Sequence, residues 1–182
     1  MEIPGERTRS SADHRARPAP GVVSAADVGI LLLRLAVGVT LAGHGAQKLF
    51  GWFDGPGLDA TGKGFADLGY EPGVFFAGLA GVSEVLGGLG LAVGLLTPLA
   101  AAATVGVMIN AMSVAPNIAL WSAEGPAFAY PMVFAVAALT IAAVGPGRLS
   151  LDVFFPWRDG GWLSAAVALV VGVVGGVVIL AL

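Results

Sequence analysis

Long apolar stretches without charged residues dominate the chain from residue 28 to its last residue. Asp, Glu, Lys and Arg are absent from residues 85–123, 125–147 and 160–182. Uncharged apolar stretches of about 18 residues or more are typical of membrane-spanning helices, because the hydrocarbon core of a bilayer is about 30 Å thick. The pattern therefore predicts an all-α fold, a polytopic bundle of transmembrane helices.

Caps, glycines and prolines divide the apolar pattern into a core of four spans and a fifth, C-terminal span. Ser24 and Asp27 have the spacing of a capping box before the first span. Thr97 and Pro98 are expected to end the second span and to cap the third, which makes these two spans antiparallel neighbours. The predicted spans cover residues 28–50, 73–96, 99–115, 128–144 and 162–182.

Two polar segments lie outside the predicted spans. Residues 1–24 hold four Arg among Pro and Ser residues, so we predict a disordered tail. Residues 51–72 are rich in Gly and hold aromatic residues that suit a membrane interface, and only one short turn is expected there, around residues 65–68. The predicted organisation is a tail over 1–24, a four-helix bundle over 25–152, and a loop with the C-terminal helix over 153–182.

Positive charges are divided unevenly between the two ends of the predicted bundle. One end has Lys63, with Lys48 at its edge. The other end has six arginines, namely Arg7, Arg9, Arg15, Arg17, Arg148 and Arg158. Cytosolic loops of membrane proteins carry an excess of Lys and Arg. We therefore predict a multi-pass protein of the cell membrane with its N-terminus in the cytosol and its C-terminus outside.

The composition agrees with a membrane protein and excludes several functions. Of the 182 residues, 57% are hydrophobic and 12% are charged, whereas about 25% are charged in a typical soluble domain. The absence of cysteine excludes disulfides, Cys-ligated iron–sulfur or zinc sites and a CxxC redox pair. A net charge of −3 without a basic excess gives no support for a nucleic-acid partner.

Glu84 lies deepest of the charged residues in the predicted bundle. It is about 16 Å from either end of the second span, too far for its short side chain to reach water. Ionisable groups at this depth normally face the bundle interior and find a partner, so we expect Glu84 to face the first span and pair with Arg34 or His44. The alternatives are a purely structural ion pair and a protonated Glu84 bonded to Asn110. For Arg34, a further alternative is that it extends to the headgroups.

Three polar residues of the first span, His44, Gln47 and Lys48, share one helix face. They are either a clamp for a ligand that enters from the outer leaflet or an interfacial cluster wetted by headgroups. We predict a hydrophobic cleft between the first three spans with His44, Lys48 and Glu84 on its wall. His44 is the only histidine in the spans, so a metal or haem site would lack ligands and none is expected. The candidate polar cluster is Arg34, His44, Gln47, Lys48, Glu84 and Asn110.

Pairs of small residues are expected to bring helices close together. Gly90 and Gly94 in the second span, and Gly172 and Gly176 in the fifth, have the spacing at which small residues allow helix backbones to approach. We therefore predict that these four glycines pack against neighbouring helices.

Several of these residues belong to short motifs in a characteristic order. The chain contains Arg34-Leu35, the run HGAQKLF at residues 44–50 and the run EVLGG at residues 84–88. In order and spacing these motifs resemble the DoxX family. The resemblance implies a small four-helix integral membrane protein whose relatives include membrane subunits of quinone-linked oxidation systems, of the thiosulfate:quinone oxidoreductase kind. The positions that match the family's polar signature are Arg34, His44, Lys48 and Glu84.

Three classes of function fit these features. The first is a membrane subunit or partner of a quinone-linked redox system, in which His44 or Lys48 donates to a quinone carbonyl and Glu84 relays a proton. There a bound quinone is the only cofactor, and a membrane redox partner carries the electrons. The second is a non-catalytic organiser of a redox complex. The third is a small proton-coupled carrier, although the chain lacks the inverted repeat typical of secondary transporters.

Overall fold

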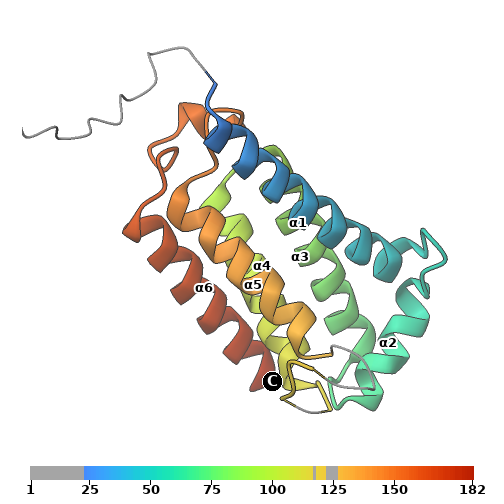
Figure 1. Ribbon diagram of the computed structural model, residues 1–182. Helices are drawn as coiled ribbons and strands as arrows, with labels where there is room; N and C mark the ends of the chain where they lie inside the picture. Colours follow the sequence, from blue (N-terminus) through green and yellow to red (C-terminus); the bar gives the residue numbers. More distant parts are fainter. Residues whose placement is uncertain (1–22, 117, 122–126) are drawn as a thin grey trace, which may run out of the picture.

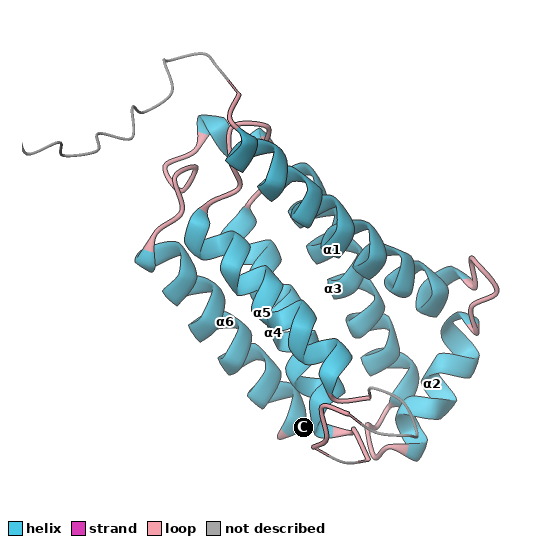
Figure 2. Cartoon of the chain, in the orientation of Figure 1, coloured by secondary structure: helices cyan, strands magenta, loops and turns pink. Residues whose placement is uncertain are grey.

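The computed structural model describes residues 23–116, 118–121 and 127–182, so residues 1–22 of the predicted tail lie outside the described residues. Over the described ranges the chain forms six α-helices and one short 3-10 helix, which confirms the all-α class (Figure 1, Figure 2). The elements are α1 (Ala25–Phe50), α2 (Gly57–Asp67), α3 (Gly73–Val93), α4 (Thr97–Ser113), α5 (Ala129–Val144), η1 (Leu151–Phe154) and α6 (Trp162–Leu180).

Helix α1 begins at the predicted capping box. The hydroxyl of Ser24 accepts a hydrogen bond from the backbone N–H of Asp27 at 3.2 Å, and the Asp27 carboxylate accepts one from the backbone N–H of Ser24 at 2.8 Å. These bonds satisfy two N–H groups that the first turn of a helix leaves unpaired. The helix ends at Gly51, whose φ of 69° lies in the left-handed region that favours glycine.

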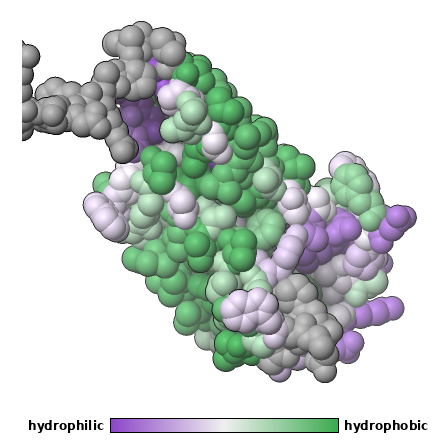
Figure 3. All heavy atoms as spheres, in the orientation of Figure 1, coloured by the Kyte–Doolittle hydropathy of each residue, from purple (hydrophilic) through white to green (hydrophobic). Residues whose placement is uncertain are grey.

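Three of the helices, α1, α3 and α6, are long and apolar enough to cross a membrane, and α4 and α5 are shorter apolar helices. All five predicted spans are thus helical, and the chain is a multi-pass membrane protein. In Figure 3 the visible surface is mostly hydrophobic along the bundle, and hydrophilic residues gather at its two ends, with the larger group at the end that carries α2.

Helix α2 lies in a segment for which a loop with one short turn was predicted, so that prediction was wrong. Glycines made residues 57–67 look like a poor helix. The structure uses two glycines for contact with α3: a β-carbon at Gly62 would lie 2.6 Å from Cγ2 of Val74, and one at Gly73 would lie 2.7 Å from the backbone nitrogen of Ala66. Packing against α3 therefore outweighs the low helix propensity of this segment.

The bundle is arranged around α4. This helix contacts α3, α5 and α6, while α1 packs along α3 and α2 packs across the start of α3 (Figure 1). The apolar core between them includes Leu41, Leu91 and Ile141, all of which are buried. Because α4 contacts helices on several sides, cavities on different sides of α4 are lined by different helices.

Four glycines fix how α1 packs on α3. A β-carbon at Gly45 would lie 2.6 Å from the carbonyl oxygen of Gly81, and one at Gly88 would lie 2.5 Å from that of Gly38. Only glycine permits backbones to approach this closely. The pairs Gly38–Gly88 and Gly45–Gly81 are two turns apart on each helix, and they set the antiparallel register of α1 against α3.

The glycines that were predicted to bring helices together have two different roles. Gly90 approaches α4, because a β-carbon there would lie 2.9 Å from Cβ of Ala100, and Gly172 approaches it too, with 2.7 Å to Cβ of Val105. A β-carbon at Gly176 would meet the carbonyl oxygen of residue 106 at 3.1 Å. Gly94 packs against a side chain of α1, because a β-carbon there would lie 2.7 Å from Cζ of Arg34, and it is also the left-handed residue, with φ of 66°, that terminates α3.

The turn between α3 and α4 is capped from a distant part of the chain. Helix α3 ends at Val93, three residues before the predicted end, and the Thr97 side chain makes no capping bond, so the predicted local cap was wrong. The Asp152 carboxylate instead accepts hydrogen bonds from the backbone N–H groups of Leu96 and Thr97, both at 2.8 Å. The positive end of the α4 helix dipole also stabilises a carboxylate at this position.

Candidate functional site

Lys48 of α1 and Glu84 of α3 form a buried ion pair at the contact between these helices. Nζ of Lys48 lies 2.6 Å from Oε2 of Glu84, and the side chains are 26% and 5% exposed. Each residue lies one turn after a glycine of the Gly45–Gly81 pair, where the two backbones are closest. Side chains on a helix lean toward its N-terminus, so on antiparallel helices these two lean toward one another.

The predicted partner of Glu84 was therefore wrong, because neither Arg34 nor His44 makes the ion pair. Lys48 is about 6 Å further along α1 than His44, so its backbone lies further from the level of Glu84. The opposed lean of the side chains and the long stem of lysine close this gap. Glu84 does face α1, as predicted, and Asn110 does not bond to it.

Arg34 has a structural partner set at the opposite end of α3. Its guanidinium donates to the carbonyl oxygens of Leu91 at 2.9 Å and Ala92 at 2.8 Å, in the last turn of α3. It also donates to the carbonyl oxygens of Pro146 at 2.6 Å and Leu149 at 2.9 Å. The glycine pairs place Arg34 at the level of the carbonyl groups in the last turn of α3. The negative end of the α3 helix dipole also stabilises a cation there. Arg34 is 1% exposed and thus neither reaches the headgroups nor belongs to the site around Glu84.

The other polar residues of α1 separate into different contacts. Gln47 donates from Nε2 to the carbonyl oxygen of Phe53 at 3.2 Å and thereby fixes the turn after the helix. Nδ1 of His44 lies 3.1 Å from Oε1 of Gln47, and its ring meets the edge of the Tyr130 ring at a centroid distance of 6.1 Å. The shared helix face therefore holds Gln47, which fixes the turn, Lys48, which makes the ion pair, and His44, which lies about one turn before both.

Asn110 connects three parts of the chain. Its amide nitrogen donates to the carbonyl oxygens of Gly106 at 3.0 Å and Gly176 at 3.1 Å, which joins α4 to α6. Its amide oxygen accepts a hydrogen bond from the hydroxyl of Tyr70 at 3.1 Å. Tyr70 was predicted only as an interfacial aromatic residue, and no local pattern in the sequence marks it as a partner of Asn110.

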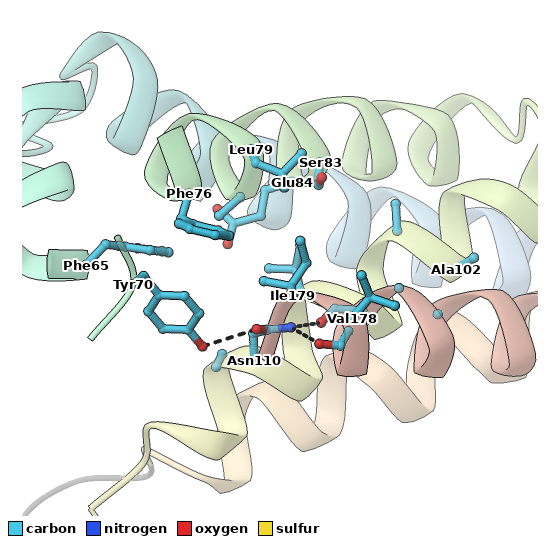
Figure 4. Close-up of a pocket in the computed structure, with 18 of the residues that line it drawn as sticks. Phe65, Tyr70, Phe76, Leu79, Ser83, Glu84, Ala102, Asn110, Val178 and Ile179 are labelled. Atoms are coloured by element: carbon cyan, nitrogen blue, oxygen red, sulfur yellow. Dashed lines mark hydrogen bonds between the residues drawn. The ribbon is translucent and has the colours of Figure 1, made fainter. Parts of the chain in front are cut away.

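A cavity of about 600 Å³ lies between α3 and α6 above the surface of α4. Small residues of α4, Ala102, Ala103 and Gly106, line its floor, and Phe65 and Tyr70 close the end next to α2 (Figure 4). The lining is almost wholly apolar. Its polar groups are those of Lys48, Tyr70, Ser83, Glu84 and Asn110.

A second cavity of about 490 Å³ lies between α1, α4 and α5. His44 and Tyr130 are on its wall together with the apolar side chains of Leu41 and Phe134. Lys48 and Glu84 line both cavities, so the ion pair is a shared wall between them. The single predicted cleft between the first three spans is thus replaced by two cavities, and α6 and α5 supply walls that the prediction did not include.

The described residues contain no group of three or more His, Asp or Glu side chains that could hold a metal ion. What the site offers is an ammonium donor, a carboxylate that can accept a proton, and a hydroxyl–amide pair, in apolar surroundings. These groups suit the recognition of a polar head on an otherwise apolar ligand.

Comparison with known proteins identifies the part of the chain that builds the ion pair. A model of the DoxX family matches residues 29–117. Residues 29–117 are a DoxX domain. No curated protein and no solved structure matches the chain. The DoxX domain covers α1 from residue 29 onward, α2, α3, α4 and every residue of the predicted polar cluster, whereas α5 and α6 lie outside it.

Proposed function

We propose that this DoxX protein is a membrane subunit of a quinone-linked redox system and that the first cavity, beside Lys48 and Glu84, holds the quinone head. The observation that carries the proposal is a buried ion pair on the wall of an apolar cavity between two membrane-spanning helices. A quinone has a flat apolar ring, which suits the apolar lining of the cavity, and two carbonyl oxygens, which can accept a hydrogen bond from the Lys48 ammonium. Its lipid tail can extend into the bilayer between α3 and α6.

The size and lining of the cavity support this ligand class. Pockets for small organic molecules measure about 300–1,000 Å³, are mostly apolar and carry a few polar groups that fix orientation. The first cavity, at about 600 Å³, falls in this range. Glu84 lies on the side of α3, and the hydrogen-bonded pair Tyr70 and Asn110 lies across the cavity from it, so polar groups occupy opposite walls (Figure 4).

The chemistry of the ion pair supports a role in proton handling. Lys48 can donate a hydrogen bond to a quinone carbonyl, and the Glu84 carboxylate can accept a proton from a quinol hydroxyl. The chain has no cysteine to ligate an iron–sulfur cluster, so a redox partner supplies or removes the electrons. The same partner would contact this protein in the cell membrane, with residues 145–161 in the cytosol, as the arginine distribution favours.

Saturable binding of a short-chain benzoquinone to purified protein in lipid nanodiscs tests the proposal. Gly175 lines the first cavity and a β-carbon there meets nothing within 4 Å, so Gly175→Leu fills the cavity without a backbone clash and should abolish binding. Gly43→Leu is the matched control, because Gly43 is also free of neighbours within 4 Å but lines neither cavity.

Glu84→Gln tests the polar part of the site with the corresponding short-chain benzoquinol, because the quinol hydroxyl can donate to the Glu84 carboxylate whereas the quinone has no donor. Loss of a hydrogen bond to a charged group costs about 1.5–3 kcal/mol, so the affinity for the quinol should fall by about tenfold or more. Absence of saturable binding to the wild type, or binding that neither Gly175→Leu nor Glu84→Gln reduces, would contradict the proposal and favour the non-catalytic organiser.

A further inference from the structure

We propose that the second cavity is a hydrated route from the polar interface to the Lys48–Glu84 pair, whereas the first cavity is a dry route from the lipid. The ion pair is then reached by water on one side and by an apolar ligand on the other. This inference deepens the proposed function, because it assigns the path by which a proton exchanged at Glu84 reaches water.

The two cavities are closed differently at the end of the bundle that carries α2. Phe65, Leu68 and Tyr70 line the first cavity there, and the hydroxyl of Tyr70 is bonded to Asn110 across its end. That cavity extends sideways between α3 and α6, two helices that can span the membrane, so its side faces lipid.

Among the described lining residues of the second cavity, the aromatic ones besides His44 are Tyr130 and Phe134 of α5, and none comes from α2 or from the segment between α2 and α3. It reaches the helix ends at Lys48, two residues before the end of α1, and at Ala127, two residues before α5. Two residues of helix correspond to about 3 Å, so Lys48 is close to the membrane boundary. The Lys48 side chain is 26% exposed although its partner is buried, which fits an ammonium group that is open to one cavity.

The lining of the second cavity suits water. Four of its ten described lining residues carry polar or charged side chains, namely His44, Lys48, Glu84 and Tyr130, whereas five of the twenty-three that line the first cavity do. Water enters protein cavities that are roomy and offer several polar partners, and it avoids apolar ones. The proton step is a simple exchange: a proton leaves the Glu84 carboxyl, passes along water beside His44, and enters bulk water, and the reverse path returns one.

Single cysteines test the two routes, because the wild-type chain has none. Met108 and Ala103 are both on α4, and they line the second and the first cavity respectively. In nanodiscs, Met108→Cys should react with a trimethylammonium-bearing methanethiosulfonate, and Ala103→Cys should react only with lipid-soluble N-phenylmaleimide. Two exposed positions serve as references for the labelling. Ala60→Cys on α2 shows the reaction of a thiol in water, and Val133→Cys on the apolar side of α5 shows the reaction of a thiol in lipid.

Labelling in SDS establishes that each thiol is present, and an unchanged elution volume establishes that each variant is folded. Failure of Met108→Cys to react with the charged reagent, like Val133→Cys, would overturn the hydrated route. Equal reaction of Ala103→Cys and Met108→Cys with the charged reagent would overturn the separation of the two cavities.

Repeating the labelling with a short-chain benzoquinone whose ring carbons are all substituted, so that it does not add to the thiol, separates this inference from the proposed function. If both hold, the quinone protects Ala103→Cys from N-phenylmaleimide and leaves the reaction of Met108→Cys unchanged. If the quinone protects neither thiol while the two reagents still distinguish them, the wet and dry routes stand and quinone binding is refuted.

Discussion

The guanidinium of Arg34 occupies the space that a side chain at Gly94 would need. A β-carbon at Gly94 would lie 2.7 Å from Cζ of Arg34, and Gly94 itself has the positive φ that ends α3. Arg34 therefore lies over the end of α3, where it binds the carbonyl oxygens of Leu91 and Ala92. The arginine and the glycine form one helix-terminating unit at the end of the bundle opposite the ion pair.

Substituting Gly94 by alanine should destabilise the protein. The left-handed conformation costs a non-glycine residue about 1–2 kcal/mol, and the added carbon also displaces Arg34. Thermal unfolding followed by circular dichroism in detergent should show a lower midpoint for Gly94→Ala. Gly43→Ala is the control, since its β-carbon meets nothing within 4 Å. Equal midpoints for the two variants would mean that Arg34 and the backbone adjust without cost.

Asp152 should contribute more to stability than a typical loop aspartate. It is buried and caps the start of α4 through two backbone N–H groups. Loss of a helix cap costs about 0.5–2 kcal/mol, so Asp152→Ala should lower the unfolding midpoint. Asp159, which is 87% exposed in its side chain, provides the comparison, and Asp159→Ala should change the midpoint little. The same loss in both variants would rule out the distant cap.

The Lys48–Glu84 pair should show strong energetic coupling. Removal of one partner leaves the other charge buried and typically costs about 3–5 kcal/mol in soluble proteins. Lys48→Met and Glu84→Gln should each lower the unfolding midpoint, and the double variant should lose less than the two single losses combined. Glu84→Ala should also destabilise more than Asn110→Ala. Additive losses in the cycle would show that the two side chains act independently.

Cysteine labelling in intact cells tests the orientation. With residues 145–161 in the cytosol and residues 51–72 outside, a membrane-impermeant maleimide should label Ala60→Cys and leave Asp159→Cys unlabelled until the cells are opened. Both positions are exposed, so access to the thiol does not depend on the fold. The reverse labelling pattern would place the N-terminal end of α1 outside.

Most of the fold was predictable because its signals are local. Uncharged apolar stretches marked α4, α5 and α6, apolar stretches with one or two charges marked α3 and α1, and the Ser24–Asp27 spacing marked the start of α1. The start of α4 was less predictable, since its cap comes from Asp152, which is far away in sequence. Helix α2 was missed for a related reason: Gly62 of α2 and Gly73 of α3 permit a close contact between the two helices, and this contact is visible only after folding.

The sequence predicted which residues belong to the candidate site better than it predicted which of them pair with one another. Burial identified Glu84, and the helix face identified His44 and Lys48. The partner of Glu84 depends on the register of α1 against α3, which Gly45 and Gly81 set by contact and which sequence spacing does not contain. The same register carries Arg34 away from the site to the last turn of α3.

The wall that α6 contributes to the first cavity lies outside the DoxX domain, which ends at residue 117. A chain of this kind that lacked α6 would expose an apolar trough along α3 and α4, of a width that one helix fills. Lipid, or a helix of another polypeptide, would then have to complete the chamber. In this protein α6 is part of the same chain, so this wall of the cavity is supplied without a second polypeptide.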